Sequence, residues 1–454
     1  MSDIYLLMTT GVILGSLLWS YQRTSDPLSP LVPFAPMLFY VYVYHPYTLL
    51  AGPGIRKYFP DANDIEYVLL LNLLCLTGFC VGAGHFRRAA TDDPRFRILE
   101  QDASAQVRRR FLHLSILMGT VASLAYWWMV AQAGGPLKLL SQAKPNLFSA
   151  SGYLGELPML TYPAMLLLAA AWQGGRLTLG RILMALYIAS PQISWAIIGK
   201  RRGTIFLISA TLAAFWYLVR NKRPNWKVVL SGVGMLGLFL LFVAANRSTG
   251  TIFDLSSDSQ SRLSQTLTGD NLEVGDEFVS ATALVLTSDH FNHHYWGKRF
   301  FAMFAIRPIP SLLWEKKWTD IGLDGLRTQP GLGGMSTLKW RQAVGFLPAG
   351  GNAGGFVSDA FLEWSWGAVI ACYGLGYFFS WLWKQWVSRG GVWTVIYIEA
   401  MILCIHLPSQ SLGSWAYRFA LLAIPTLILF RLFTSRKPSR QMPSAQGPIP
   451  MVKL

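Results

Sequence analysis

The sequence predicts an all-α polytopic membrane protein, and three observations support this class. Hydrophobic residues occupy 52% of the 454 positions, charged residues occupy only 14%, and the mean hydropathy is positive. Apolar runs recur along the chain at about the twenty-residue length that a helix needs to cross a bilayer. A chain with so little polar surface is not typical of soluble proteins.

The apolar runs predict about eleven transmembrane helices. They divide the chain into spans one to eight (1–245), one large loop (246–355), spans nine to eleven (356–433) and a basic tail (434–454). The expected spans lie near 4–21, 31–51, 66–85, 111–133, 156–174, 181–199, 203–220, 227–245, 356–383, 391–410 and 415–433.

The distribution of Lys and Arg predicts the orientation. Assigning alternate sides to successive loops puts the basic clusters at 85–110, at 220–227 and in the C-terminal tail on the same face. Short cytoplasmic loops are enriched in Lys and Arg, so this face is expected to be cytoplasmic and the 246–355 loop to be extracytoplasmic. The formal net charge of +16 is explained by clusters beside apolar spans, and we expect no nucleic-acid partner.

We predict neither a metal site nor a cofactor. All four cysteines lie in apolar runs, which does not suggest a disulfide framework or a thiolate site: Cys75, Cys80, Cys372 and Cys404. The loop histidines could instead bind a metal, but they lack a paired carboxylate frame: His290, His293 and His294. The sequence shows neither a phosphate-binding glycine loop nor a strand–helix nucleotide motif.

A tight basic turn joins predicted spans six and seven, with Lys200, Arg201 and Arg202 between Gly199 and Gly203. The expected topology places this turn on the outer face, where short loops are usually poor in positive charge. One interpretation is a statistical exception. The other is an anion site, because paired guanidinium groups bind phosphate through fork-shaped hydrogen bonds.

Three carboxylates fall inside predicted spans: Asp359, Glu363 and Glu399. Asp359 and Glu363 are four residues apart, so a helix places them on one face. Carboxylates at membrane depth usually face a cavity or a partner. Both a functional role and a structural pairing with a buried arginine, such as Arg418, fit this pattern.

The large loop divides into segments of different composition. A short helix is predicted over 276–288, with Asp276 and Glu277 in its first turn. An aromatic and basic stretch over 295–317 suits the lipid headgroup layer, and the glycine-rich 322–355 segment resembles a flexible lid.

Two pieces of this loop carry a family resemblance. The sequences Tyr-Trp-Gly-Lys-Arg-Phe-Phe (295–301) and Arg-Pro-Ile-Pro-Ser-Leu-Leu-Trp-Glu-Lys-Lys (307–317), with the arginine-bearing turn before span seven, resemble the oligosaccharide repeat-unit polymerases, the O-antigen polymerase (Wzy-type) family. The resemblance covers roughly residues 195–380, and its most family-like part is Ile309, Pro310, Trp314 and Lys317. The arginine–glycine repeats of some members are missing.

The resemblance implies joining of oligosaccharide units carried on polyprenyl diphosphate at the periplasmic face of a bacterial inner membrane, with a cytoplasmic C-terminus. Donor and acceptor would both be lipid-linked, and a chain-length regulator and a flippase would be partners. An acceptor hydroxyl would attack the anomeric carbon while arginines stabilise the departing diphosphate.

This chemistry selects candidate residues for each role. Those expected to bind the diphosphate are Arg201, Arg202, Arg247, Arg307, Arg327 and Lys317. Glu277 is the first candidate for the general base, followed by Asp276, His290 and Asp359.

Two other functions also fit these residues. A ligase that transfers finished glycan to a lipid core would use the same donor and similar arginines. A lipid-glycan flippase or other transporter would be expected to show internal repeats and charged residues along several spans, and no such repeat is visible.

Overall fold

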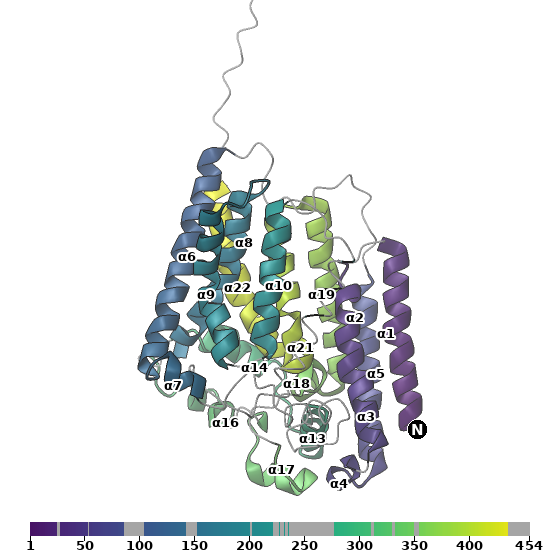
Figure 1. The fold of residues 1–454 in the computed structure, drawn as a ribbon. Helices are drawn as coiled ribbons and strands as arrows, with labels where there is room; N and C mark the ends of the chain where they lie inside the picture. Colours follow the sequence, from purple (N-terminus) through teal and green to yellow (C-terminus); the bar gives the residue numbers. More distant parts are fainter. Residues whose placement is uncertain are drawn as a thin grey trace, which may run out of the picture.

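The computed structural model describes residues 1–24, 28–52, 54–85, 104–141, 152–199, 202–220, 277–309, 313–328, 332–348 and 354–434, with isolated positions 227, 231 and 235. Within these residues the chain forms helices and no strand. The long helices run roughly side by side, and the shorter helices of the large loop gather at one end of the bundle (Figure 1).

The first half of the chain supplies these helices: α1 (Ser2–Thr24), α2 (Leu31–Phe39), η1 (Tyr40–Tyr44), α3 (His45–Ala51), α4 (Ile55–Tyr58), α5 (Ala62–Ala83), α6 (Ala105–Gln132), α7 (Pro136–Ser141), η2 (Gly152–Leu160), α8 (Thr161–Trp172), α9 (Leu179–Gly199) and α10 (Arg202–Arg220). The second half supplies α13 (Glu277–His290), α14 (Lys298–Phe301), η3 (Ala302–Ile306), α15 (Lys317–Asp320), α16 (Asp324–Thr328), α17 (Thr337–Val344), α18 (Gly355–Trp364), η5 (Ser365–Gly367), α19 (Ala368–Arg389), α20 (Val392–Ile402), η6 (Leu403–Ile405), α21 (His406–Ser409) and α22 (Leu412–Thr434).

Five of the described helices are long and apolar enough to cross a membrane: α1, α5, α6, α9 and α22. Two shorter apolar helices cover 204–220 and 392–408. The all-α membrane class is therefore confirmed. The total of eleven spans stays a prediction, and the expected 227–245 span lies almost entirely outside the described residues.

Two predicted spans are wrong as continuous α-helices. The 356–383 segment breaks at Ser365, whose φ of 52° ends α18 and begins a 3-10 turn before α19. The 156–174 segment begins as the 3-10 helix η2, with Pro158 inside it, and becomes α-helical only at Thr161. Hydropathy indicates that a segment is buried, but it does not report backbone breaks.

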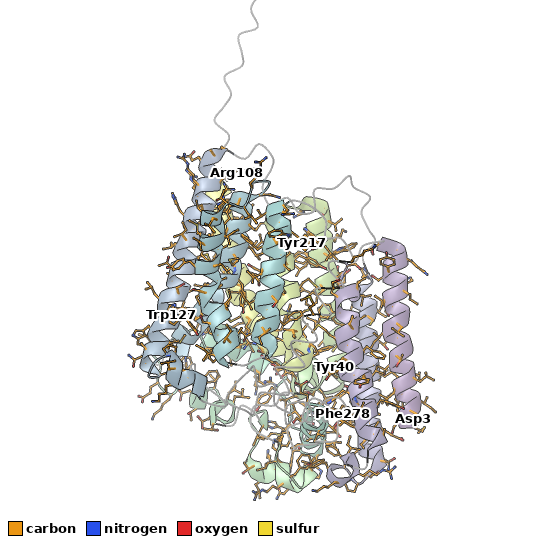
Figure 2. All side chains as sticks on the ribbon, in the orientation of Figure 1. Asp3, Tyr40, Arg108, Trp127, Tyr217 and Phe278 are labelled. Atoms are coloured by element: carbon orange, nitrogen blue, oxygen red, sulfur yellow. The ribbon has the colours of Figure 1, made fainter. Side chains whose placement is uncertain are left out.

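Two large apolar cores fill most of the bundle. One packs α1, α2 and α5 against α19 and α20, and the other packs α6, α8, α9 and α10 together. The side chains filling the bundle appear in Figure 2, where Phe278 marks the end occupied by the loop helices and Arg108 lies near the opposite end. We call these the loop end and the far end.

A third core attaches the loop to the bundle. Val279 of α13, Trp340 of α17 and Leu362 of α18 are almost completely buried together with residues at the loop end of α1 and α5. Trp340 lies within the segment predicted to be a flexible lid, so the described part of that segment is anchored by a buried aromatic side chain.

Glycines bring α5 and α19 into close backbone contact. A Cβ added at Gly376 would lie 2.1 Å from the Phe79 carbonyl oxygen, and one at Gly82 would lie 2.2 Å from the Tyr373 carbonyl oxygen. Small residues allow this approach between membrane helices, where dispersion contacts rather than the hydrophobic effect drive association.

We expect Gly376→Ala to lower the free energy of unfolding by roughly 1–3 kcal/mol, because the added methyl group forces the two backbones apart. Gly374→Ala is the matched control, since nothing lies within 4 Å of a Cβ at that position of the same helix. Unfolding midpoints in detergent, followed by circular dichroism, measure the difference. Equal midpoints for the two variants would contradict the close contact.

Candidate functional site

A buried ion cluster lies where the large loop meets α18. Asp359 and Glu363 are on one face of this helix, as their spacing predicts, and both are buried. The Arg299 guanidinium forms an ion pair with Asp359, and its Nε lies 3.5 Å from Glu363 Oε2. Two carboxylates and one guanidinium are thus removed from water together.

The backbone of the loop holds Arg299 against α18. The segment docks on the end of the helix through hydrogen bonds from the Tyr295 and Trp296 N–H groups to the carbonyl oxygens of Leu362 and Glu363. Gly297 then adopts a φ of 87°, a left-handed conformation that glycine accepts without steric cost, and α14 begins. The Arg299 N–H donates to Glu363 Oε1 at 3.2 Å.

The cation that pairs with the α18 carboxylates is therefore Arg299, which corrects the suggestion of Arg418. Burial acts to lower the pKa of Arg299, but Asp359 and Glu363 outweigh it and raise that pKa above its ordinary value. Arg299 remains charged. Its Nη1 atom is buried and has no hydrogen-bond partner among the described residues.

Asp359 also connects the cluster to α22. Its second carboxylate oxygen accepts a hydrogen bond of 3.0 Å from the Gly413 N–H in the first turn of that helix. Both oxygens are thus engaged, which does not favour the predicted role of Asp359 as a general base and fits a positioning role.

Arg307 joins three segments that are far apart in the sequence. Its Nη2 lies 3.2 Å from Glu156 Oε1 of η2, and its guanidinium carbon lies 4.1 Å from the ring centroid of Tyr417 in α22. The side chain is 40% exposed and that of Glu156 is 23% exposed. Arg307 is therefore held in place from two sides while part of its side chain remains exposed.

Lys317 supports the turn that carries Arg307. Its side chain is 3% exposed, and its ammonium donates to the carbonyl oxygens of Ile306 and Arg307 at 3.3 Å and to that of Ile309. An ammonium group has three donors, and three carbonyls engage them. Lys317 thus holds the backbone around Arg307, which differs from the direct diphosphate contact that the sequence predicted.

A third arginine lies on α22 itself. Arg418 donates to Gln410 Oε1, which also accepts a hydrogen bond of 2.8 Å from Ser414. Arg299, Arg307 and Arg418 are thus associated with the first two turns of α22, the helix end that carries a partial positive charge. We call these three arginines, together with Asp359, Glu363 and Glu156, the α22 cluster.

The other predicted site residues are placed as follows. Glu277 is half-buried at the start of α13, a helix that packs against α17 and α18. His290 is exposed at the opposite end of α13. Asp276, Arg201 and Arg247 lie outside the described residues, as do the side chains of Arg202 and Arg327.

The loop histidines make polar and aromatic contacts. His294 Nδ1 lies 3.3 Å from Ser288 Oγ and 3.1 Å from the Phe361 carbonyl oxygen. Burial, with smaller effects of Lys339 and His294, lowers the pKa of His293 below its ordinary value. In the described part of the chain, no three His, Cys, Asp or Glu side chains gather in an arrangement that could hold a metal ion.

Sequence reasoning assigned no site role to Glu156, Arg299 or Arg418. One signal was present for the first of them, because Glu156 is the only acidic residue between Asp102 and Asp254. A single carboxylate in so long an interval is worth testing as a partner for an arginine. Nothing in the sequence distinguishes Arg299 from the other nine basic residues of the loop.

Comparisons with family models, with curated proteins and with solved structures find no match to this chain.

Proposed function

We propose that the protein is a membrane glycosyltransferase that joins polyprenyl-diphosphate-linked oligosaccharide units into a polysaccharide such as O-antigen, capsule or exopolysaccharide. The observation that carries the proposal is the α22 cluster, in which three arginines are associated with one end of a membrane helix. Arg307 offers a partly exposed side chain whose guanidinium is held in place by two other segments. Such preorganised donors stabilise a developing anion without reorganising during the reaction.

The polyprenyl diphosphate leaving group fits this arrangement by its negative charge and by its position in the membrane. A polyprenyl diphosphate keeps its tail in the lipid, its sugars in water and its phosphates at the membrane surface. Guanidinium groups bind phosphate oxygens in pairs, and the N-terminus of α22 adds a favourable dipole. The buried Arg299 Nη1, which has no hydrogen-bond partner among the described residues, is a further donor that an anion would satisfy.

The reaction also needs a base that takes the proton of the attacking hydroxyl group. In this proposal the acceptor sugar oxygen bonds to the anomeric carbon, its proton passes to a carboxylate, and the bond from that carbon to the diphosphate oxygen breaks. Glu156 is the carboxylate in contact with Arg307, which favours it as the base over Glu277, Asp276 and His290. When the diphosphate occupies Arg307, Glu156 would be released beside the reacting centre.

The orientation follows the same proposal. The chain would span a bacterial inner membrane about eleven times, with the loop end in the periplasm and the C-terminus in the cytoplasm. Donor and acceptor would both be lipid-linked and would arrive from a flippase, and a chain-length regulator would be a partner. The reaction would use no cofactor, because the lipid-linked donor already carries an activated sugar.

The purified protein, incubated with a single lipid-linked repeat unit, is expected to produce a ladder of longer products on a gel. Heat-inactivated protein in the same detergent is the control. Product that forms only after a second, non-repeat acceptor lipid is added would identify a ligase instead. Movement of the unmodified lipid across vesicles without any product would identify a transporter.

A further inference from the structure

Two arginines meet at the far end of the bundle, on neighbouring helices. Arg110 lies in the second turn of α6, and Arg431 lies in the last turn of α22. Phe111 and Phe430, each next in sequence to one of these arginines, contact each other with ring centroids 5.7 Å apart. The yellow end of α22 is visible beside the upper end of α6 in Figure 1. The two arginines therefore flank one contact between α6 and α22.

Both arginines lie on the outward faces of their helices. Leu117 follows Arg110 by seven residues and is 60% exposed. Ile424 and Ile428 precede Arg431 by seven and three residues and are 55% and 52% exposed. Residues at these spacings share a helix face. Each cation thus ends an exposed apolar stripe, which in a membrane protein is the surface that faces lipid.

No carboxylate of the described residues neutralises these two cations. Neither α6 nor α22 contains Asp or Glu, and no described ion pair includes Arg110 or Arg431. Arg108 and Arg109 precede Arg110, so three consecutive arginines occupy the first two turns of α6. Cations at the start of a helix are unfavourable, because that end already carries a partial positive charge. An external anion would offset this cost.

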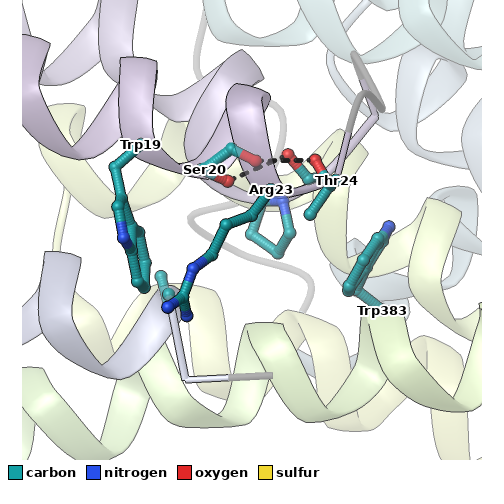
Figure 3. Close-up of a pocket in the computed structure, with 9 residues that line it drawn as sticks. Trp19, Ser20, Arg23, Thr24 and Trp383 are labelled. Atoms are coloured by element: carbon teal, nitrogen blue, oxygen red, sulfur yellow. Dashed lines mark hydrogen bonds between the residues drawn. The ribbon is translucent and has the colours of Figure 1, made fainter. Parts of the chain in front are cut away.

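A second basic place at the far end is too small to hold such an anion. Arg23 and Trp19 of α1 line a pocket together with Trp383 of α19 (Figure 3). Its internal space is about 10 Å³, which is room for one water molecule at most. The surface formed by α6 and α22 has no such limit, because its arginines and apolar residues are partly or fully exposed.

We propose that Arg110 and Arg431 bind the phosphate headgroup of an anionic phospholipid, whose acyl chains lie along the exposed apolar residues of α6 and α22. Guanidinium groups bind phosphate oxygens through paired hydrogen bonds. A lipid fits this surface better than free phosphate or an acidic protein segment, because the cations and the apolar stripes share one face. Basic residues between membrane helices bind anionic headgroups in this way. The site lies at the opposite end of the bundle from the α22 cluster and does not depend on the proposed reaction.

Native mass spectrometry of the full chain in a neutral detergent tests this site, with equal amounts of phosphatidylglycerol and phosphatidylcholine added. The wild type is expected to retain more phosphatidylglycerol. Arg110→Gln and Arg431→Gln are each expected to reduce that preference about fivefold, the effect of one basic residue near an anionic surface. Melting temperatures followed by circular dichroism check that both variants are folded.

Arg109→Gln is the matched control. It removes the same charge from the same turn of α6, but successive residues of a helix point about 100° apart, so it should keep most of the preference. Equal losses in the Arg109 and Arg110 variants would mean a general charge effect and would overturn the site. An unchanged preference in Arg431→Gln, or no preference in the wild type, would also overturn it.

Competition separates the lipid from soluble anions. The bound phosphatidylglycerol is expected to remain when millimolar inorganic phosphate or a polyglutamate peptide is added. Displacement by phosphate would make this a free-phosphate site, and displacement by the peptide would indicate an acidic protein partner. Either result would overturn the lipid assignment.

Discussion

Arg299→Met is expected to lower the free energy of unfolding by about 3–5 kcal/mol, the usual cost of leaving a buried charge without its partner. Asp359 and Glu363 both depend on this guanidinium, and Glu363 is 0% exposed. Removing the cation would leave two like charges on adjacent turns of α18. The loss should appear as a lower unfolding midpoint in detergent and a smaller amount of monodisperse protein.

Neutralising all three residues of the buried ion cluster separates the effect of unpaired charge on stability from the effect of lost packing. The triple variant Arg299→Met, Asp359→Asn, Glu363→Gln is expected to recover most of the lost stability, because no unpaired charge remains. Lys298→Met, at the exposed neighbouring position, is the control for the loss of one positive charge. If Arg299→Met is as stable as Lys298→Met, the ion cluster does not hold the loop against α18.

Arg307→Ala is expected to reduce polymer formation about a hundredfold to a thousandfold, which is the usual effect of removing one donor from a developing anion. Arg307→Lys should also be impaired, because a single ammonium cannot reproduce the planar fork of the guanidinium. The partly exposed side chain makes a large loss of stability unexpected, since exposed ion pairs contribute little to folding. Product length and membrane abundance should be measured on the same preparation.

Lys316→Ala is the control for this site, because Lys316 is an exposed cation of the same loop and should have nearly normal activity. Glu156→Gln keeps the hydrogen-bonding shape beside Arg307 but cannot accept a proton, so it should slow turnover with little effect on donor binding. Normal-length polymer from Arg307→Ala would remove the α22 cluster from the proposed reaction. Joint loss of polymer and protein would instead indicate a folding defect.

Much of the architecture was determined by the sequence. The apolar runs that became α1, α5, α6, α9 and α22 were recognisable because a membrane helix must be apolar for its whole length. The short helix α13 was recognisable from its apolar spacing and from Glu277 in its first turn. The shared face of Asp359 and Glu363 follows from helical geometry alone. These are local properties, and a local pattern suffices to predict them.

Only the tertiary structure decided which charges meet. Arg299 and Asp359 are 60 residues apart, and Arg307 and Glu156 are 151 residues apart, so no spacing rule connects them. The partner of the α18 carboxylates depends on how the 295–299 segment docks on that helix, and this depends on backbone hydrogen bonds and on the left-handed Gly297. The positive charge of Lys317 is evident from the sequence. Its three carbonyl partners come within hydrogen-bonding distance only when the chain turns back on itself. The three-dimensional path of the chain determines which charged residues pair. Burying a charge is costly unless an opposite charge or a hydrogen-bonding group lies beside it in the folded protein.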